Sequence, residues 1–239
     1  ARGPQRRAGS ARCRPPDRQV YIAAGETDRA LCPPRRHGEG GWRRRRRDRP
    51  AQARSAPATG AHQGVVAMVA AHAYATVDEI LENAKSRGEA PLIVLCDDLS
   101  DPHNLGAIIR TAECAGAHGV IIPKRRSVGL TAVVGKASAG ALEYLPVARV
   151  SNLVSTIRDL QKAGVWVFGT AADGDTGLYT ADLKGPAAIV IGNEGEGMSR
   201  LVSEACDFKV SIPMHGRISS LNASNAAAIL LYEAVRQRG

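Results

Sequence analysis

The chain has 239 residues, 44% of them hydrophobic and 23% charged, with a formal net charge of +9, which suits one large domain or a domain of about 150–200 residues with an appendage. No run approaches the roughly 18 apolar residues that a membrane-spanning helix needs, so we expect no contact with a membrane. The five cysteines form an odd set without a C-x-x-C pair, which argues against a disulfide scaffold or a zinc site and favours the reducing cytoplasm.

The first quarter of the chain differs from the rest. Residues 1–60 hold 16 arginines, no lysine, seven prolines and five acidic residues, a net charge of +11, whereas the remaining 179 residues carry −2. Apolar periodicity is absent there, and only the stretch 20–24 could form a short strand. Three interpretations stay open: a disordered arm attracted to phosphates, a degenerate accessory domain, or a GC-rich gene read out of frame or from a wrong start.

From about residue 61, short apolar runs are separated by turn residues. Five runs are predicted as strands, namely 91–96, 119–122, 165–169, 187–191 and 208–212. Apolar stripes between them predict helices over about 105–116, 153–164 and 222–236. Strands that are buried on both faces and alternate with helices predict an α/β fold, with a parallel sheet covered by helices on both faces.

Polar residues collect in the loops that follow three of these strands. The loops are 97–104, 192–197 and 213–222. Ligands of such sheets bind beyond the carboxyl ends of the strands, so we expect the loops to form one composite site. The six histidines show no metal-ligand spacing, and no metal is expected there.

Three ordered segments resemble a known family. They are Asp101-Pro102-His103-Asn104-Leu105-Gly106-Ala107-Ile108-Ile109-Arg110-Thr111-Ala112, then Ile189-Val190-Ile191-Gly192-Asn193-Glu194-Gly195-Glu196-Gly197, and then Ile212-Pro213-Met214 with Ser219-Ser220-Leu221-Asn222-Ala223-Ser224. Together they are similar to the SpoU-type (TrmH-like) RNA 2′-O-ribose methyltransferases of the SPOUT superfamily, over about residues 61–239. Three further segments resemble the branch that methylates a guanosine of 23S ribosomal RNA: His62-Gln63-Gly64-Val65, Pro123-Lys124-Arg125 and Tyr232-Glu233-Ala234.

The resemblance implies a fold, a cofactor and partners. Residues 89–239 would form a methyltransferase domain with a C-terminal trefoil α/β knot, after a linker at 61–88, with residues 1–60 in place of an RNA-binding domain. The cofactor would be S-adenosylmethionine, the working unit a homodimer, and the substrate RNA, with ribosomal RNA expected first. Transfer RNA as the substrate, or a non-catalytic RNA-binding or ribosome-assembly protein that keeps the knot, are the alternatives.

The resemblance also assigns catalytic roles. A ribose 2′-hydroxyl holds its proton at neutral pH, so methyl transfer needs a base or an anion-stabilising group. Arg110, which points away from the apolar stripe of its helix, would bind an RNA phosphate and assist deprotonation. Asn104 would orient the ribose or Arg110, Glu194 would organise the loops, and Ser220 with Asn222 would hold ribose and cofactor in register. The simpler roles are a solvated arginine, a solvated turn acid for Glu194, and helix caps for the other three.

Cofactor binding would rest mainly on the backbone. Gly192 is expected to let the chain approach adenosine closely, because glycine has no side chain. Ile212, kept extended by the proline that follows it, and Leu221 would supply apolar walls, with Thr170 as a fourth contact.

A basic cluster follows the predicted strand 119–122. Its residues are Lys124, Arg125 and Arg126, which would contact RNA phosphates or else form a solvated face.

Overall fold

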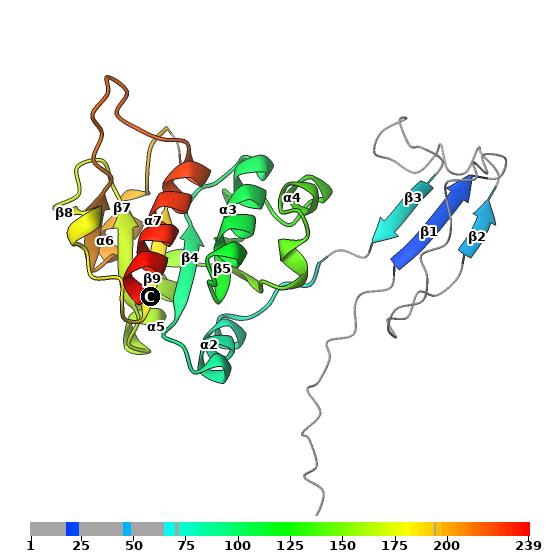
Figure 1. Ribbon diagram of the computed structural model, residues 1–239, viewed down its shortest axis with the longest axis horizontal. Coiled ribbons are helices and arrows are strands. Elements are labelled where there is room, and N and C mark those ends of the chain that lie inside the picture. Colours follow the sequence, from blue (N-terminus) through cyan, green and yellow to red (C-terminus); the bar gives the residue numbers. More distant parts are fainter. Residues whose placement is uncertain (1–17, 24–44, 49–64, 70–71, 194) are drawn as a thin grey trace, which may run out of the picture. The chain divides into compact units, whose positions relative to one another are not determined.

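The computed structural model describes residues 18–23, 45–48, 65–69, 72–193 and 195–239 (Figure 1). The chain divides into two compact units, Ala1–His72 and Ala73–Gly239. No helix in the described part of the chain combines the length and the apolar character needed to cross a membrane.

The first unit contains a three-stranded sheet. Its central strand β1 (Arg18–Ala23) pairs parallel with β2 (Arg45–Asp48) and antiparallel with β3 (Val65–Val69). Strand β1 overlaps the stretch 20–24 that the sequence singles out, whereas β2 comes from the arginine run, where no apolar pattern signals a strand. These strands lie in the segments treated above as an arm and a linker, and those domain boundaries stay a prediction.

The second unit is built on a seven-stranded sheet in which every strand pair is parallel. The strands are β4 (Leu92–Cys96), β5 (Gly119–Pro123), β6 (Val147–Val150), β7 (Trp166–Thr170), β8 (Thr176–Gly177), β9 (Ala187–Ile191) and β10 (Phe208–Ser211). Their order across the sheet is β6-β5-β4-β9-β7-β10-β8. The predicted parallel α/β fold is therefore confirmed. The knotted path that the resemblance implies stays a prediction.

Helices cover both faces of this sheet (Figure 1). They are α2 (Val77–Arg87), α3 (Pro102–Cys114), α4 (Ala132–Ala137), α5 (Leu153–Lys162), α6 (Arg200–Ala205) and α7 (Ala223–Arg238), with short 3-10 helices η1 (Ala141–Glu143) and η2 (Leu178–Thr180). Alternate residues of the central strands face opposite cores: in β4, Leu92 and Val94 pack with α3 and α7, whereas Ile93 packs with α2 and α5. Burial on both faces explains why these strands read as continuous apolar runs.

Helix α2 lies in the stretch treated as a linker, yet it packs on the second unit through the fully buried Ile80. A capping box begins it: the hydroxyl of Thr76 accepts from the Glu79 amide, and the Glu79 carboxylate accepts from the Thr76 amide. Gly88 ends it in the left-handed conformation, at a φ of 68°. The compact unit therefore begins at Ala73, before this helix.

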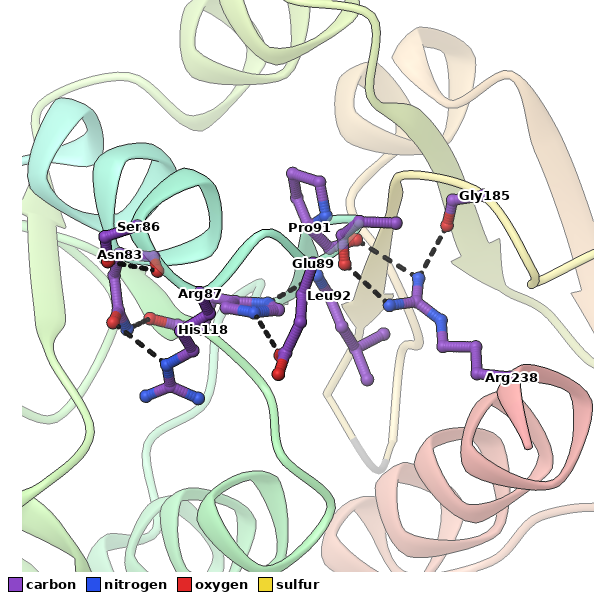
Figure 2. Close-up of polar contacts among 10 residues, drawn as sticks. Asn83, Ser86, Arg87, Glu89, Pro91, Leu92, His118, Gly185 and Arg238 are labelled. Atoms are coloured by element: carbon purple, nitrogen blue, oxygen red, sulfur yellow. Dashed lines mark hydrogen bonds and ion pairs between the residues drawn. The ribbon is translucent and has the colours of Figure 1, made fainter.

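A polar network fastens the end of the sheet where β4 begins (Figure 2). Buried His118 accepts from the Leu92 amide at Nδ1 and donates from Nε2 to Glu89, 3.0 Å away. Arg238, at the end of α7, donates to the carbonyl oxygens of Ala90, Pro91, Leu183 and Gly185. The C-terminal helix is thereby tied to the segments that lead into β4 and β9.

Candidate functional site

A cavity of about 420 Å³ opens at the carboxyl ends of β7, β9 and β10. The residues that line it are Thr170, Ala171, Ala172, Asp173, Ile191, Gly192, Asn193, Gly195, Glu196, Gly197, Met198, Ser203, Val210, Ile212, Met214, Ser219, Ser220, Leu221, Ala223 and Ala226. All four residues predicted to bind the cofactor are among them, together with Ser220. A cavity of this size, with apolar walls and many backbone groups, suits a ligand of nucleoside dimensions.

Asn104 and Asn222 join two of the predicted loops. The Nδ2 of Asn222 donates to Oδ1 of Asn104, at 3.0 Å, across 118 residues of sequence. Asn104 is not a helix cap, because Asp101 caps α3 by accepting from the His103 amide, and Asn104 is buried inside the first turn. Asn222 does cap α7, since its Oδ1 accepts from the Ser224 amide, so for this residue the two interpretations are compatible.

Asn193 joins the second loop to the first. Its Nδ2 donates to the Asp98 carbonyl at 2.9 Å, and its Oδ1 accepts from the Gly195 amide at 2.8 Å. The backbones of Asn193 and Gly197 also exchange two hydrogen bonds of 2.9 Å, which close the loop on itself. Hydrogen bonds thus connect the three predicted loops to one another at a single edge of the sheet.

Gly192 lines the cavity for a reason that differs from the sequence-based expectation. A Cβ built on Gly192 overlaps the backbone of Gly197 and Met198, so the space beside it is filled by the loop itself. A similar requirement holds at Gly169, where a Cβ would lie 2.7 Å from the Met198 side chain and 2.8 Å from the Cys206 sulfur. Glycine is therefore needed at position 192 so that the loop can fold back against β9, whereas at position 169 the side chains of Met198 and Cys206 would have to shift.

Arg110 lies apart from the cavity. It is exposed on α3, and it forms no hydrogen bond or ion pair with any residue that the structure describes. Six residues of helix separate it from Asn104, which corresponds to about 9 Å along the axis and about 240° around it. Arg110 therefore points off the buried stripe, as predicted, and within one chain it faces away from the bond between Asn104 and Asn222. Glu194 lies outside the described residues.

The predicted basic cluster is exposed and held in place from two sides. On one side, the segment after the cluster is bonded to the first loop: Val128 N and Ser127 Oγ both donate to the Leu99 carbonyl. On the other side Arg149 donates to the carbonyl of Lys124, at 3.1 Å, and its guanidinium lies 5.4 Å from the centre of the Tyr74 ring. The cluster thus sits beside the first loop, at the carboxyl ends of β5 and β6.

Asp173, Glu196 and Met198 line the cavity but are absent from the sequence-based set. Glu196 lies within the glycine-rich segment and Met198 follows it directly, so their position on either side of Gly197 was the available signal. Asp173 lies in a turn after β7 that carries no feature beyond its polarity. Below the cavity, burial raises the pKa of the Cys206 thiol to about 12, with the charge of Asp207 adding to the effect, so this sulfur stays protonated and is not a nucleophile.

Comparison with known proteins identifies the family. The model of the SpoU rRNA Methylase family matches residues 91–232, more than half of the chain. A tRNA/rRNA methyltransferase of the TrmH family from Bacillus subtilis is 53% identical over 180 residues, 75% of this chain and 72% of that protein. A tRNA/rRNA methyltransferase from Synechocystis is 51% identical over 178 residues, but the match covers 46% of its length.

Solved structures agree with these relatives. The SpoU methyltransferase AviRb from Streptomyces viridochromogenes, in complex with AdoMet, gives a TM-score of 0.65 at 38% identity, over 73% of this chain and 66% of that one. An AdoMet-bound rRNA methyltransferase from Sinorhizobium meliloti gives 0.63 at 32% identity, over 73% and 64%. Given the family match, the relatives and the cavity at the expected edge of the sheet, the chain belongs to the SpoU rRNA methylase family.

Proposed function

We propose that this family member is an S-adenosylmethionine-dependent RNA methyltransferase that methylates a ribose 2′-hydroxyl of a guanosine in 23S ribosomal RNA. The observation that carries the proposal is the cavity that collects Thr170, Gly192, Ile212 and Leu221 beside the bond between Asn104 and Asn222. The cytoplasm is the expected location, in line with the cysteine pattern.

The residues of the cavity fit the cofactor. Ile212 and Leu221 offer apolar surface for an adenine, while the backbone around Gly192 and the hydroxyl of Thr170 offer hydrogen-bonding groups. Two carboxylates, Asp173 and Glu196, give the lining a negative charge that suits a cationic ligand. When bound, S-adenosylmethionine supplies an electrophilic methyl group on a sulfonium.

The chain's own residues have the chemistry to prepare the 2′-hydroxyl. Asn104 and Asn222 hold each other's amides in a fixed orientation and can position a ribose, with Ser220 at the cavity wall as a further hydroxyl donor. Arg110 would neutralise a phosphate and stabilise the developing alkoxide, and Glu194 would orient it. These assignments are parts of the proposal.

A homodimer accounts for the position of Arg110. Its exposure, and its lack of an ion-pair partner among the described residues, support a role in the site of a second subunit. This predicts complementation at a cofactor concentration too low to saturate Gly192→Ala: Arg110→Ala and Gly192→Ala would each turn over slowly, and their mixed dimers would hold one complete site. Random 1:1 mixing would then restore about a quarter of wild-type turnover. No recovery on mixing would contradict the shared site.

The basic cluster would bind the RNA on either side of the target nucleotide. Lys124, Arg125 and Arg126 lie beside the first loop, so phosphates could continue from the catalytic loop onto them. Replacing all three by alanine should flatten the dependence of log Kd on log salt by about 0.7 for each lost phosphate contact. An unchanged slope would contradict RNA contact there.

Methyl transfer to total RNA tests the substrate. Purified protein, labelled S-adenosylmethionine and separated ribosomal and transfer RNAs should give label in 23S RNA, recovered as 2′-O-methylguanosine after digestion. Label in transfer RNA would favour that substrate instead. Cofactor binding without transfer to either RNA would favour a non-catalytic RNA-binding role.

A further inference from the structure

The loop 193–199 forms one wall of the cavity, and both of its ends are tied to the segment that follows β4. At its start, Asn193 donates to the carbonyl of Asp98. At its end, the amide of Ser199 donates to Oδ2 of Asp97, at 2.7 Å. The bonds between Asn193 and Gly197 close the loop on itself, whereas the two ties are hydrogen bonds that join the loop to the segment after β4.

Asp97 is suited to hold such a tie. Its side chain is only 7% exposed, and its own amide donates to the Ile191 carbonyl at 2.8 Å, which continues the pairing of β4 with β9. The strand ladder therefore fixes the backbone from which the carboxylate projects, and a buried carboxylate that accepts a backbone N–H gives a stronger bond than a neutral acceptor does. Its charge also acts on the thiol of Cys206, just after α6, which agrees with a position beneath the loop.

We propose that Asp97 is a positioning residue, whose carboxylate holds the Ser199 end of the loop 193–199 so that Gly195–Met198 keep the wall against which the cofactor binds. Asp97 is not among the residues that line the cavity, so it acts through the loop. The proposal rests on the proposed function for its ligand, S-adenosylmethionine. The tie itself can be tested without any ligand.

Asp207 offers a matched control. Its Oδ2 accepts from the amide of Val167 at 2.8 Å, which is the same kind of bond, but it lies at the other end of β7 from Thr170. Asp97→Ala and Asp207→Ala therefore each remove a carboxylate that accepts from one backbone amide, and Asp207 also accepts from the side chain of Gln161. Asp97→Asn keeps an acceptor oxygen without the charge.

Two measurements on the full-length variants test the proposal: hydrogen–deuterium exchange of peptides covering 193–200, and calorimetric titration with S-adenosylmethionine. Asp97→Ala should speed exchange in 193–200 and weaken cofactor binding about tenfold or more, raising KM for the cofactor more than it lowers kcat. Asp97→Asn should recover binding to within about threefold of wild type. Asp207→Ala should change neither readout.

A second variant removes the same bond from the other partner. Ser199 has a φ of −60°, which proline adopts, so Ser199→Pro deletes the donor at a compatible backbone angle and should reproduce Asp97→Ala. Unchanged exchange and affinity in Asp97→Ala, or equal losses in Asp97→Ala and Asp207→Ala, would overturn the proposal. If the wild type bound no S-adenosylmethionine, the proposed function would fail, and the exchange data alone would decide the role of Asp97.

Discussion

Replacing Gly192 by alanine tests whether the loop must fold against β9. The added Cβ would lie 2.7 Å from the carbonyl oxygen of Gly197, whereas ordinary contact begins at 3.4 Å, and it would overlap two further backbone atoms. Because backbone cannot rotate aside as a side chain can, the loop must shift by about 0.7 Å or more. Overpacking of this kind costs about 1–3 kcal/mol. If the bound state must restore the original loop position, the free energy of binding falls by that amount, and the affinity for S-adenosylmethionine weakens by about 5- to 150-fold.

The assay is calorimetric titration of S-adenosylmethionine into Gly192→Ala, with thermal unfolding measured in parallel. Gly185, just before β9, provides the control, because a Cβ there meets no atom within 4 Å. We expect Gly185→Ala to bind as the wild type does. Wild-type affinity in Gly192→Ala, or an equal loss in both variants, would refute the argument that the loop requires glycine at this position.

Three further predictions concern other parts of the second unit. Asn104→Ala and Asn222→Ala should each lower kcat/KM, and the double variant should lose less than the sum, because the two amides bond to each other. His118→Asn should make the free energy of unfolding less dependent on pH. Burial lowers the pKa of His118 in the folded protein, so the stability that the neutral imidazole contributes is complete above about pH 6.5. That stability is lost as the pH falls, by up to about 1.4 kcal/mol per pH unit. Urea unfolding of wild type and variant between pH 7.5 and 5.5 measures the difference. Arg238→Met should lower the free energy of unfolding by about 2 kcal/mol or more, because it leaves carbonyl oxygens of two segments, 90–91 and 183–185, without their donor.

Each of these has an outcome that would contradict it. Additive losses in the Asn104 and Asn222 variants would mean that their bond does not matter for turnover. Parallel pH profiles for wild type and His118→Asn would mean that His118 does not stay neutral in the folded protein. An unchanged urea midpoint in Arg238→Met would show that the end of α7 needs no such tie.

Long apolar runs made most of the sheet predictable. The runs at 91–96 and 187–191 correspond to β4 and β9. Both strands are buried on their two faces, so neither alternates between apolar and polar residues, and each appears in the sequence as a continuous apolar run. Strand β6 was missed because Arg149 interrupts its apolar run, and β8 because it has two residues. Helix α2 was also missed, although Thr76 and Glu79 carry the spacing of a capping box, a signal that the sequence does contain.

The site was predictable where it follows strands and not where it depends on distant contacts. Thr170 ends a strand and Gly192 and Ile212 come directly after strands, so the rule for parallel sheets places them at one edge. The cap of α3 could have been assigned to Asp101, because Pro102 at the first helical position marks it. The bond between Asp97 and Ser199 joins residues 102 positions apart in the sequence, and a local sequence pattern does not predict such a contact.

The most direct test of the account is transfer of a labelled methyl group from S-adenosylmethionine to 23S ribosomal RNA by the purified protein, followed by complete digestion of the RNA. The account predicts that the label is recovered as 2′-O-methylguanosine, and that Arg110→Ala loses it while still binding the cofactor. Label on a base, or full transfer by Arg110→Ala, would contradict it.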